Sequence, residues 1–187
     1  MLIVMFEDLF RYGEFASVFA AEKIIYFLQK FGGKDYFKID FKPYIYGPYS
    51  GGKVAHVLYY LNGSYITGMG SMDNSPFSFI WLADDAAQCA REYLANYGDD
   101  RLSAICERTK SFLAYYYSNH SLELLSSVDY ILENSPELSD WRERDENEVR
   151  EIIMRKLAEW NERKKRIFNP SHVETVLRHL KSISAEA

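Results

Sequence analysis

The sequence predicts an α+β protein that is mainly helical, with a winged-helix-like N-terminal half, a small antiparallel sheet and a C-terminal helical bundle. Apolar residues recur at helical spacing through most of the chain, short runs with strand patterns occur only in the first half, and glycine or proline separates the early elements. With 187 residues and 48% hydrophobic content, the chain suits a single domain, residues 1–187, with a further division into 1–83 and 84–187.

Helix and strand patterns alternate in the first half. Residues 14–31 are too densely apolar for a surface helix, so this helix is expected to be central, and Gly32 and Gly33 end it. Residues 36–41 alternate aromatic or aliphatic side chains with charged ones, as a strand with one buried face does. In order, we expect a helix at 14–31, a strand at 36–41, a helix at 51–61 and paired strands at 65–68 and 77–82, with a polar loop at 68–76.

The second half is predicted to be helical. Asp84 and Asp99 are suitable caps for the first two helices, and Pro170 suits the first turn of the last one. In order, we expect helices at 85–97, 100–117, from 121, at 145–168 and from 170 to near the end. Trp160 and the leucines around Leu124 are expected to face inward on periodicity.

The segment Tyr44–Ser50 is the most informative part of the sequence. Pro48 fixes its own φ, and Gly47 tolerates backbone angles that a side chain would forbid, so the chain should turn sharply here. The turn presents three tyrosines, each with an apolar face and one hydroxyl. They suit a partner surface, or equally a lid over the protein's own core. The three are Tyr44, Tyr46 and Tyr49.

Bulk properties exclude several classes of function. The net charge of −5 and the pI of about 5.4 do not favour broad attraction to nucleic acid or anionic lipid. The N-terminus lacks the basic start and cleavage site of a signal peptide, and no apolar run approaches the roughly 20 residues of a membrane span. Cys89 and Cys106 lack metal or redox spacing and fit helices as small buried thiols. A cytoplasmic protein is expected.

Charge is uneven in the second half. Nine acids between residues 129 and 151 face only three arginines, which leaves a local charge of minus six, and a basic run follows at 163–166. Solvated helix faces are a sufficient explanation for both, but four of the acids are also candidates for partner binding. These four are Glu133, Glu137, Asp140 and Glu143.

No catalytic motif is evident, and we predict no metal and no cofactor. The four histidines show no HExxH pair, and nucleophile-elbow, P-loop and dinucleotide patterns are missing. The helix at 51–61, which would be the recognition helix of a winged-helix protein, offers DNA only Lys53 and His56. Protein is therefore the better partner, and these two residues are candidates for binding it. A hydrolase built on the tyrosine turn and His56 is a remaining alternative.

Six blocks of residues, in order and spacing, resemble the C-terminal toxin-binding domain of DarG-type antitoxins, and more distantly the Panacea antitoxin domain. The resemblance covers nearly the whole chain. Residues 115–119 depart from it, since the glycine-aromatic pair frequent in the family is absent there. The blocks are Glu22-Lys23 with Tyr26–Gln29, Tyr46–Tyr49, His56–Leu58, Gly63 with Tyr65–Gly68, Leu122–Val128 and Trp160–Lys164.

The resemblance implies a non-enzymatic antitoxin domain of a DarT/DarG toxin–antitoxin system. In that family a separate macrodomain removes ADP-ribose from DNA, and this domain binds the DNA ADP-ribosyltransferase toxin with a surface that mimics DNA. Nothing in these 187 residues resembles the macrodomain, so its hydrolase activity is not carried over. The acidic excess at 129–151 is compatible with such mimicry. The alternative is a winged-helix regulator that binds the operator DNA of a toxin–antitoxin operon.

Overall fold

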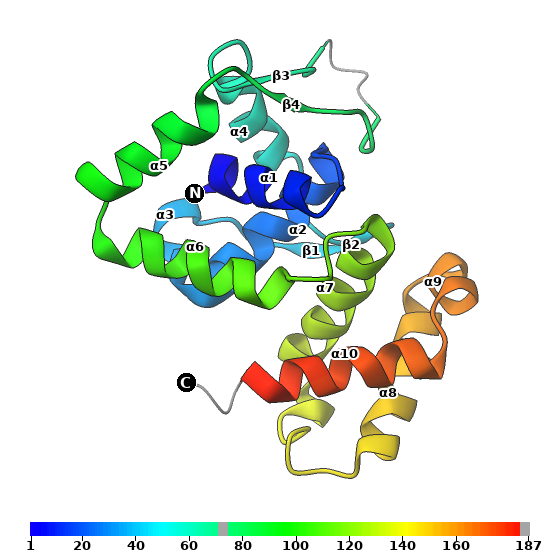
Figure 1. The fold of residues 1–187 in the computed structure, drawn as a ribbon. Coiled ribbons are helices and arrows are strands. Elements are labelled where there is room, and N and C mark those ends of the chain that lie inside the picture. Colours follow the sequence, from blue (N-terminus) through cyan, green and yellow to red (C-terminus); the bar gives the residue numbers. More distant parts are fainter. Residues whose placement is uncertain (71–74, 184–187) are drawn as a thin grey trace. The chain divides into compact units, whose positions relative to one another are not determined.

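Helices make up most of the computed structural model, which describes residues 1–70 and 75–183 (Figure 1). The prediction of a mainly helical α+β protein with a small antiparallel sheet is confirmed. The helices are α1 (Leu2–Arg11), α2 (Val18–Leu28), α3 (Lys34–Phe37), α4 (Lys53–Leu61), α5 (Ala86–Asn96), α6 (Asp100–Leu113), α7 (Asn119–Asn134), α8 (Glu146–Trp160), α9 (Glu162–Ile167) and α10 (Pro170–Ile183), with a π-helical turn η1 (Gln29–Gly33) and a 3-10 turn η2 (Pro136–Leu138). The strands are β1 (Lys42–Tyr44), β2 (Gly47–Tyr49), β3 (Ile66–Thr67) and β4 (Trp81–Leu82).

The chain divides into two compact units. The N-terminal unit comprises Met1–Lys42 with Tyr49–Asn119, and the C-terminal unit comprises Pro43–Pro48 with the chain from His120 onward. The division follows packing, because α5 and α6 pack on α1 and α6 also packs on α2. The sequence pattern placed a boundary at residue 83, whereas these contacts keep residues 84–119 with the first helices.

The N-terminal unit is built around α2, whose side chains are buried on nearly every face. Ser17 caps this helix, since its Oγ accepts the Ala20 N–H at 3.1 Å. The predicted central helix is therefore confirmed. The apolar N-terminus, for which no element was predicted, forms α1 and contributes Met5, Phe6 and Leu9 to the same core.

The predicted strand at 36–41 is wrong. The chain continues as α3 to Phe37, and Lys38 then adopts a left-handed conformation with φ 52°. The side chain of Gln29 donates to the carbonyl of Ile39 and accepts its N–H, both at 2.8 Å. This amide satisfies the backbone groups that a neighbouring strand would otherwise pair, so the alternating pattern does not require a sheet.

The predicted pairing of two strands after α4 is confirmed, although both strands are shorter than expected. In the antiparallel pair, Ile66 lies opposite Leu82 and Thr67 opposite Trp81. Ile80, within the second predicted strand, pairs elsewhere, because its N–H donates to the Ala16 carbonyl at 2.9 Å. The predicted loop at 68–76 includes residues 71–74, which lie outside the described part of the chain.

In the C-terminal unit α8 packs against both α9 and α10 (Figure 1). The continuous helix predicted at 145–168 is wrong, because Asn161 interrupts it with extended backbone, φ −168° and ψ 158°. Its side-chain Oδ1 accepts the Lys164 N–H at 2.8 Å and so starts α9. An apolar period continues across the break, which is why periodicity alone does not detect it.

The two cysteines differ in environment. Cys106 is buried on α6 as expected, but Cys89 is exposed, because α5 buries only Ala86 and Leu94. Among the residues that the structure describes, no helix combines the length and the apolar character needed to cross a bilayer.

Candidate partner-binding groove

The tyrosine segment turns sharply, as predicted, and forms a hairpin in which Gly47 and Pro48 belong to β2 and not to the turn itself. β1 and β2 pair across a turn at residues 45–46, and Gly47, which follows it, has φ 107°, a value that side chains rarely permit. Tyr44 and Ile45 at the tip are 55% and 47% exposed, whereas Gly47 and Pro48 are buried. The tip therefore presents apolar side chains on a conformationally restricted backbone.

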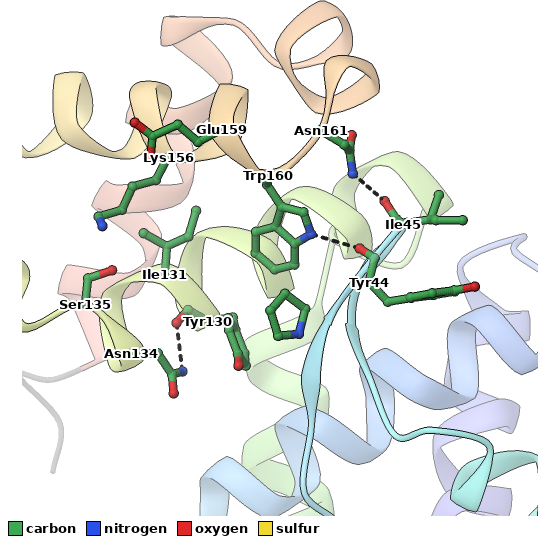
Figure 2. A pocket seen from close by; sticks show the side chains of 11 residues that line it. Tyr44, Ile45, Tyr130, Ile131, Asn134, Ser135, Lys156, Glu159, Trp160 and Asn161 are labelled. Atoms are coloured by element: carbon green, nitrogen blue, oxygen red, sulfur yellow. Dashed lines mark hydrogen bonds between the residues drawn. The ribbon is translucent and has the colours of Figure 1, made fainter.

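The end of α8 holds this hairpin in the C-terminal unit (Figure 2). The indole Nε1 of Trp160 donates to the carbonyl of Tyr44 at 2.9 Å, and Nδ2 of Asn161 donates to the carbonyl of Ile45 at 3.1 Å. Asn161 thus caps α9 through its oxygen and binds the hairpin through its nitrogen. Breaking α8 at this residue is what allows one side chain to do both.

A groove of about 580 Å³ lies between the hairpin, α7 and α8 (Figure 2). The rings of Tyr130 and Trp160 meet edge to face in it, with centroids 5.7 Å apart. Burial raises the pKa of Tyr130, so its phenol stays neutral. The lining is aromatic and aliphatic with a few polar groups, and consists of Pro43, Tyr44, Ile45, Tyr130, Ile131, Asn134, Ser135, Lys156, Glu159, Trp160 and Asn161.

A buried polar cluster supports the hairpin side of this groove. Lys164 is fully buried, and its Nζ donates to Glu123 at 2.9 Å and to the hydroxyl of Ser127 at 3.0 Å. Arg163 also donates to Glu123, and its guanidinium lies 5.0 Å from the ring centroid of Tyr46. Burial lowers the pKa of Lys164, and the charge of Glu123 opposes that shift.

Internal ion pairs neutralise part of the acidic run. Glu137 pairs with Lys156 at 2.6 Å and Arg155 at 3.1 Å, and the hydrogen bond from Lys156 lowers the pKa of Glu137. Asp140 lies 3.8 Å from Arg144. Asp129, expected on a solvated face, is instead 2% exposed. The net charge of minus six therefore overstates what this surface offers a partner.

The structure distributes the nine predicted partner-binding residues over both units. Tyr44 lines the groove, and Tyr46 is half-buried beneath Arg163. Tyr49 is half-buried and belongs to the N-terminal unit, which also holds Lys53 and His56, both exposed on α4. The four acids are exposed in the C-terminal unit with Tyr44 and Tyr46. They are Glu133, Glu137, Asp140 and Glu143.

Several groove residues were not singled out from the sequence. Trp160 was expected to face the core, but it is half-buried and turns its ring into the groove. Tyr130 on α7 and Lys156 on α8 lie more than 80 residues beyond the hairpin in sequence, so no local pattern connects them with it. The adjacent Trp-Asn pair at 160–161 was the available signal, because asparagine is a helix-capping residue within an apparently continuous helical pattern.

No protein-family model matches this chain, and no curated protein matches its sequence. The function is therefore inferred from the residues that the structure brings together.

Proposed function

We propose that this chain is an antitoxin domain that binds a DNA ADP-ribosyltransferase toxin directly and occupies its DNA-binding surface. The observation that carries this proposal is the meeting of three blocks of the DarG-type resemblance within the C-terminal unit. Tyr46 lies under Arg163, Glu123 binds Lys164, and Trp160 holds the hairpin. The first and last of these blocks lie more than a hundred residues apart in sequence, and together they support one exposed hairpin tip beside the groove.

The tip is the part of this surface best suited to anchor a protein. Tyr44 and Ile45 are large apolar side chains that remain half exposed, while the hydrogen bonds from Trp160 and Asn161 already fix their backbone. A preorganised tip loses little conformational entropy on binding, and buried aromatic anchors dominate most interfaces. We expect the tip and the adjoining groove to contact the toxin first.

Carboxylates without internal partners would supply the mimicry of DNA phosphates. Within residues 1–70 and 75–183, the side chains of Glu143 and Glu151 have no hydrogen-bond or ion-pair partner, and both are exposed. Glu137, in contrast, already binds two cations. A partner's lysines and arginines would have to compete for Glu137, so Glu143 and Glu151 should contribute more to the association rate.

The first experiment combines the full chain with a cognate DarT-type toxin. Complex formation would be measured by calorimetry, and modification of single-stranded DNA by the toxin would be followed in the same samples. Binding with inhibition is expected. A folded chain that neither binds nor inhibits the toxin would refute the proposal.

Two sets of variants locate the surface. The double change Tyr44→Ala with Ile45→Ala should lower toxin affinity by at least about tenfold, while Tyr97→Ala, at a more exposed tyrosine that follows α5, should leave it unchanged. The double reversal Glu143→Arg with Glu151→Arg should slow association and reduce its salt dependence, with Glu92→Arg as the control. Equal loss from test and control variants would remove the C-terminal unit from the interface.

A second candidate function is supported by the N-terminal unit. There α4 is followed directly by the antiparallel pair of β3 and β4, which is the element order of a winged-helix DNA-binding domain. Lys53 and His56 are exposed on that helix. Operator binding should then fall steeply with salt, and Lys53→Ala should reduce the salt dependence. Binding to DNA that is insensitive to salt would refute this function.

A further inference from the structure

Besides the groove of the C-terminal unit, a hollow lies in the N-terminal unit, and neither proposed function uses it. It has a volume of about 340 Å³ and lies between α6 on one side and η1 with α3 on the other. We call it the arginine pocket, because the charged side chains that line it are Arg101 and Arg108. Its lining consists of Phe31, Gly32, Tyr36, Arg101, Ala104, Ile105 and Arg108.

Helical geometry places both arginines on one face. Arg108 follows Arg101 by seven positions, which is two turns or about 10 Å along the helix axis. Ala104 lies between them and is exposed, so its small side chain leaves space there. Across the pocket, Gly32 has φ 115°, and a Cβ at this position would meet Ile105 at 3.4 Å. A small residue on either side thus keeps the hollow open.

Arg108 is a cation without an internal acid. Its guanidinium lies over the ring of Phe31, 5.1 Å from the centroid, and within the described part of the chain it has no carboxylate partner. One guanidinium face is therefore supported by an aromatic ring, and the arginine as a whole is exposed. A planar guanidinium held in this way can stack on a second ring.

Arg101 is held in position by a carboxylate that does not line the pocket. Its Nε and Nη2 contact one oxygen of Asp99 at 2.8 and 2.6 Å, and the hydroxyl of Tyr36 donates to the same oxygen at 3.1 Å. The side-chain hydrogen bond from Arg101 lowers the pKa of Asp99 to about 2, so this carboxylate is ionised at neutral pH. Nη1 of Arg101 takes no part in these contacts and keeps its donors for a ligand.

We propose that the arginine pocket binds a planar ring that carries a phosphate, of the size of one nucleotide. The ring stacks on Arg108 over Phe31, and the phosphate accepts hydrogen bonds from Arg101. Arginine is the side chain best suited to phosphate, and the two-turn spacing keeps the phosphate contact apart from the stacking contact. The volume is near the lower limit of ligand pockets, about 300 Å³, which leaves no room for a dinucleotide.

The full chain would be titrated calorimetrically with adenosine monophosphate, adenosine, inorganic phosphate and a triglutamate peptide. Adenosine monophosphate should bind, and adenosine and phosphate should each bind at least about tenfold more weakly, because each lacks one of the two contacts. Equal binding of adenosine would refute the phosphate contact. If the peptide binds more tightly than adenosine monophosphate, the stacking of a ring on Arg108 is refuted. If adenosine monophosphate does not bind at millimolar concentration, the site itself is refuted.

Three variants test the location. Arg108→Ala should weaken binding of adenosine monophosphate by at least about tenfold, since it removes both charge and stacking. Ala104→Trp removes no charge but fills the pocket, and it should abolish binding even if Arg108→Ala impairs folding. Arg11→Ala removes an exposed arginine of the same unit and should leave affinity unchanged. Binding that survives both pocket variants in folded protein would overturn the proposal.

Discussion

Each unit buries a glutamate, and the two carboxylates receive their hydrogen bonds from different kinds of donor. Glu22 on α2 receives neutral donors: the N–H of Ser50 at 3.0 Å and its hydroxyl at 2.7 Å, while that hydroxyl accepts the Val54 N–H at 3.0 Å. Glu123 on α7 receives cationic donors, from Lys164 and Arg163. Glu22 caps the segment that follows the hairpin, and Glu123 ties α7 to α9.

The difference determines how each unit should respond to mutation and to pH. Burial raises the pKa of Glu22, and the Ser50 hydrogen bonds and the charge of Lys23 only partly offset that rise. A carboxyl whose folded-state pKa is raised contributes stability that is present at low pH and lost as pH rises through that pKa. A buried ion pair, in contrast, stays charged, so loss of either partner leaves the other uncompensated.

The largest effect is expected from Lys164→Met. It removes the buried cation and leaves Glu123 with Arg163 alone, which should cost the C-terminal unit about 3 kcal/mol of unfolding free energy. Urea unfolding followed by hydrogen exchange of peptides from each unit would measure it. The double variant Glu123→Gln with Lys164→Met should regain part of the loss. A loss of less than about 1 kcal/mol in the single variant would show that Lys164 and Glu123 do not behave as a buried ion pair.

Ser50→Ala should have the next largest effect, in the N-terminal unit. It removes the hydroxyl that donates to Glu22 and accepts from Val54, at a cost of about 2 kcal/mol at neutral pH. Because that hydroxyl bond lowers the pKa of Glu22, the variant should raise it further and regain stability as the pH falls. Ser126→Ala is the matched control, since Ser126 is equally buried but its hydroxyl donates only to carbonyls of its own helix. Equal losses from the two variants would contradict a special role for Ser50.

Ser50 also illustrates what the sequence can predict. Periodicity located α2, α4 and the turn between β1 and β2, because these depend on local patterns of apolar, glycine and proline residues. It could not predict that Ser50 and Glu22, 28 residues apart, share two hydrogen bonds. Long-range polar pairing depends on the tertiary contacts themselves. The predicted strand at 36–41 failed for the same reason, because the amide of Gln29 took the place of a strand partner.

The groove residues were also only partly predictable from the sequence. Tyr44 was a candidate for partner binding, with a lid over the core as the alternative, and it lines the groove at an exposed hairpin tip. Trp160 was assigned to the core because it fits an apolar helical period, and that period carries no information about where the helix ends. The end depends on Asn161, whose two side-chain functions involve residues 3 and 116 positions away.

Variants of Asn161 can therefore distinguish its capping of α9 from its attachment of the hairpin. Asn161→Ala removes both functions and should cost about 1 kcal/mol or somewhat more. Asn161→Asp keeps the oxygen that accepts the Lys164 N–H but loses the donor to Ile45, so most of the stability should remain. Urea unfolding would compare the two, and hydrogen exchange at residues 43–48 should rise in both. Unchanged exchange in the aspartate variant would show that Trp160 alone holds the hairpin.

The smallest effect concerns the pH response of the C-terminal unit. His120 lies against His172 with ring centroids 5.3 Å apart, and burial, followed by the neighbouring His172, lowers the pKa of His120. A histidine with a lowered folded-state pKa contributes stability that is present above its unfolded value of about 6.5 and lost as pH falls. Acidification should thus weaken this unit through His120 while it favours the N-terminal unit through Glu22. Hydrogen exchange measured at pH 7.5 and 5.5 should show that protection of the C-terminal unit falls relative to protection of the N-terminal unit. This difference should be smaller in His120→Gln. An identical difference in that variant would assign the effect to other groups.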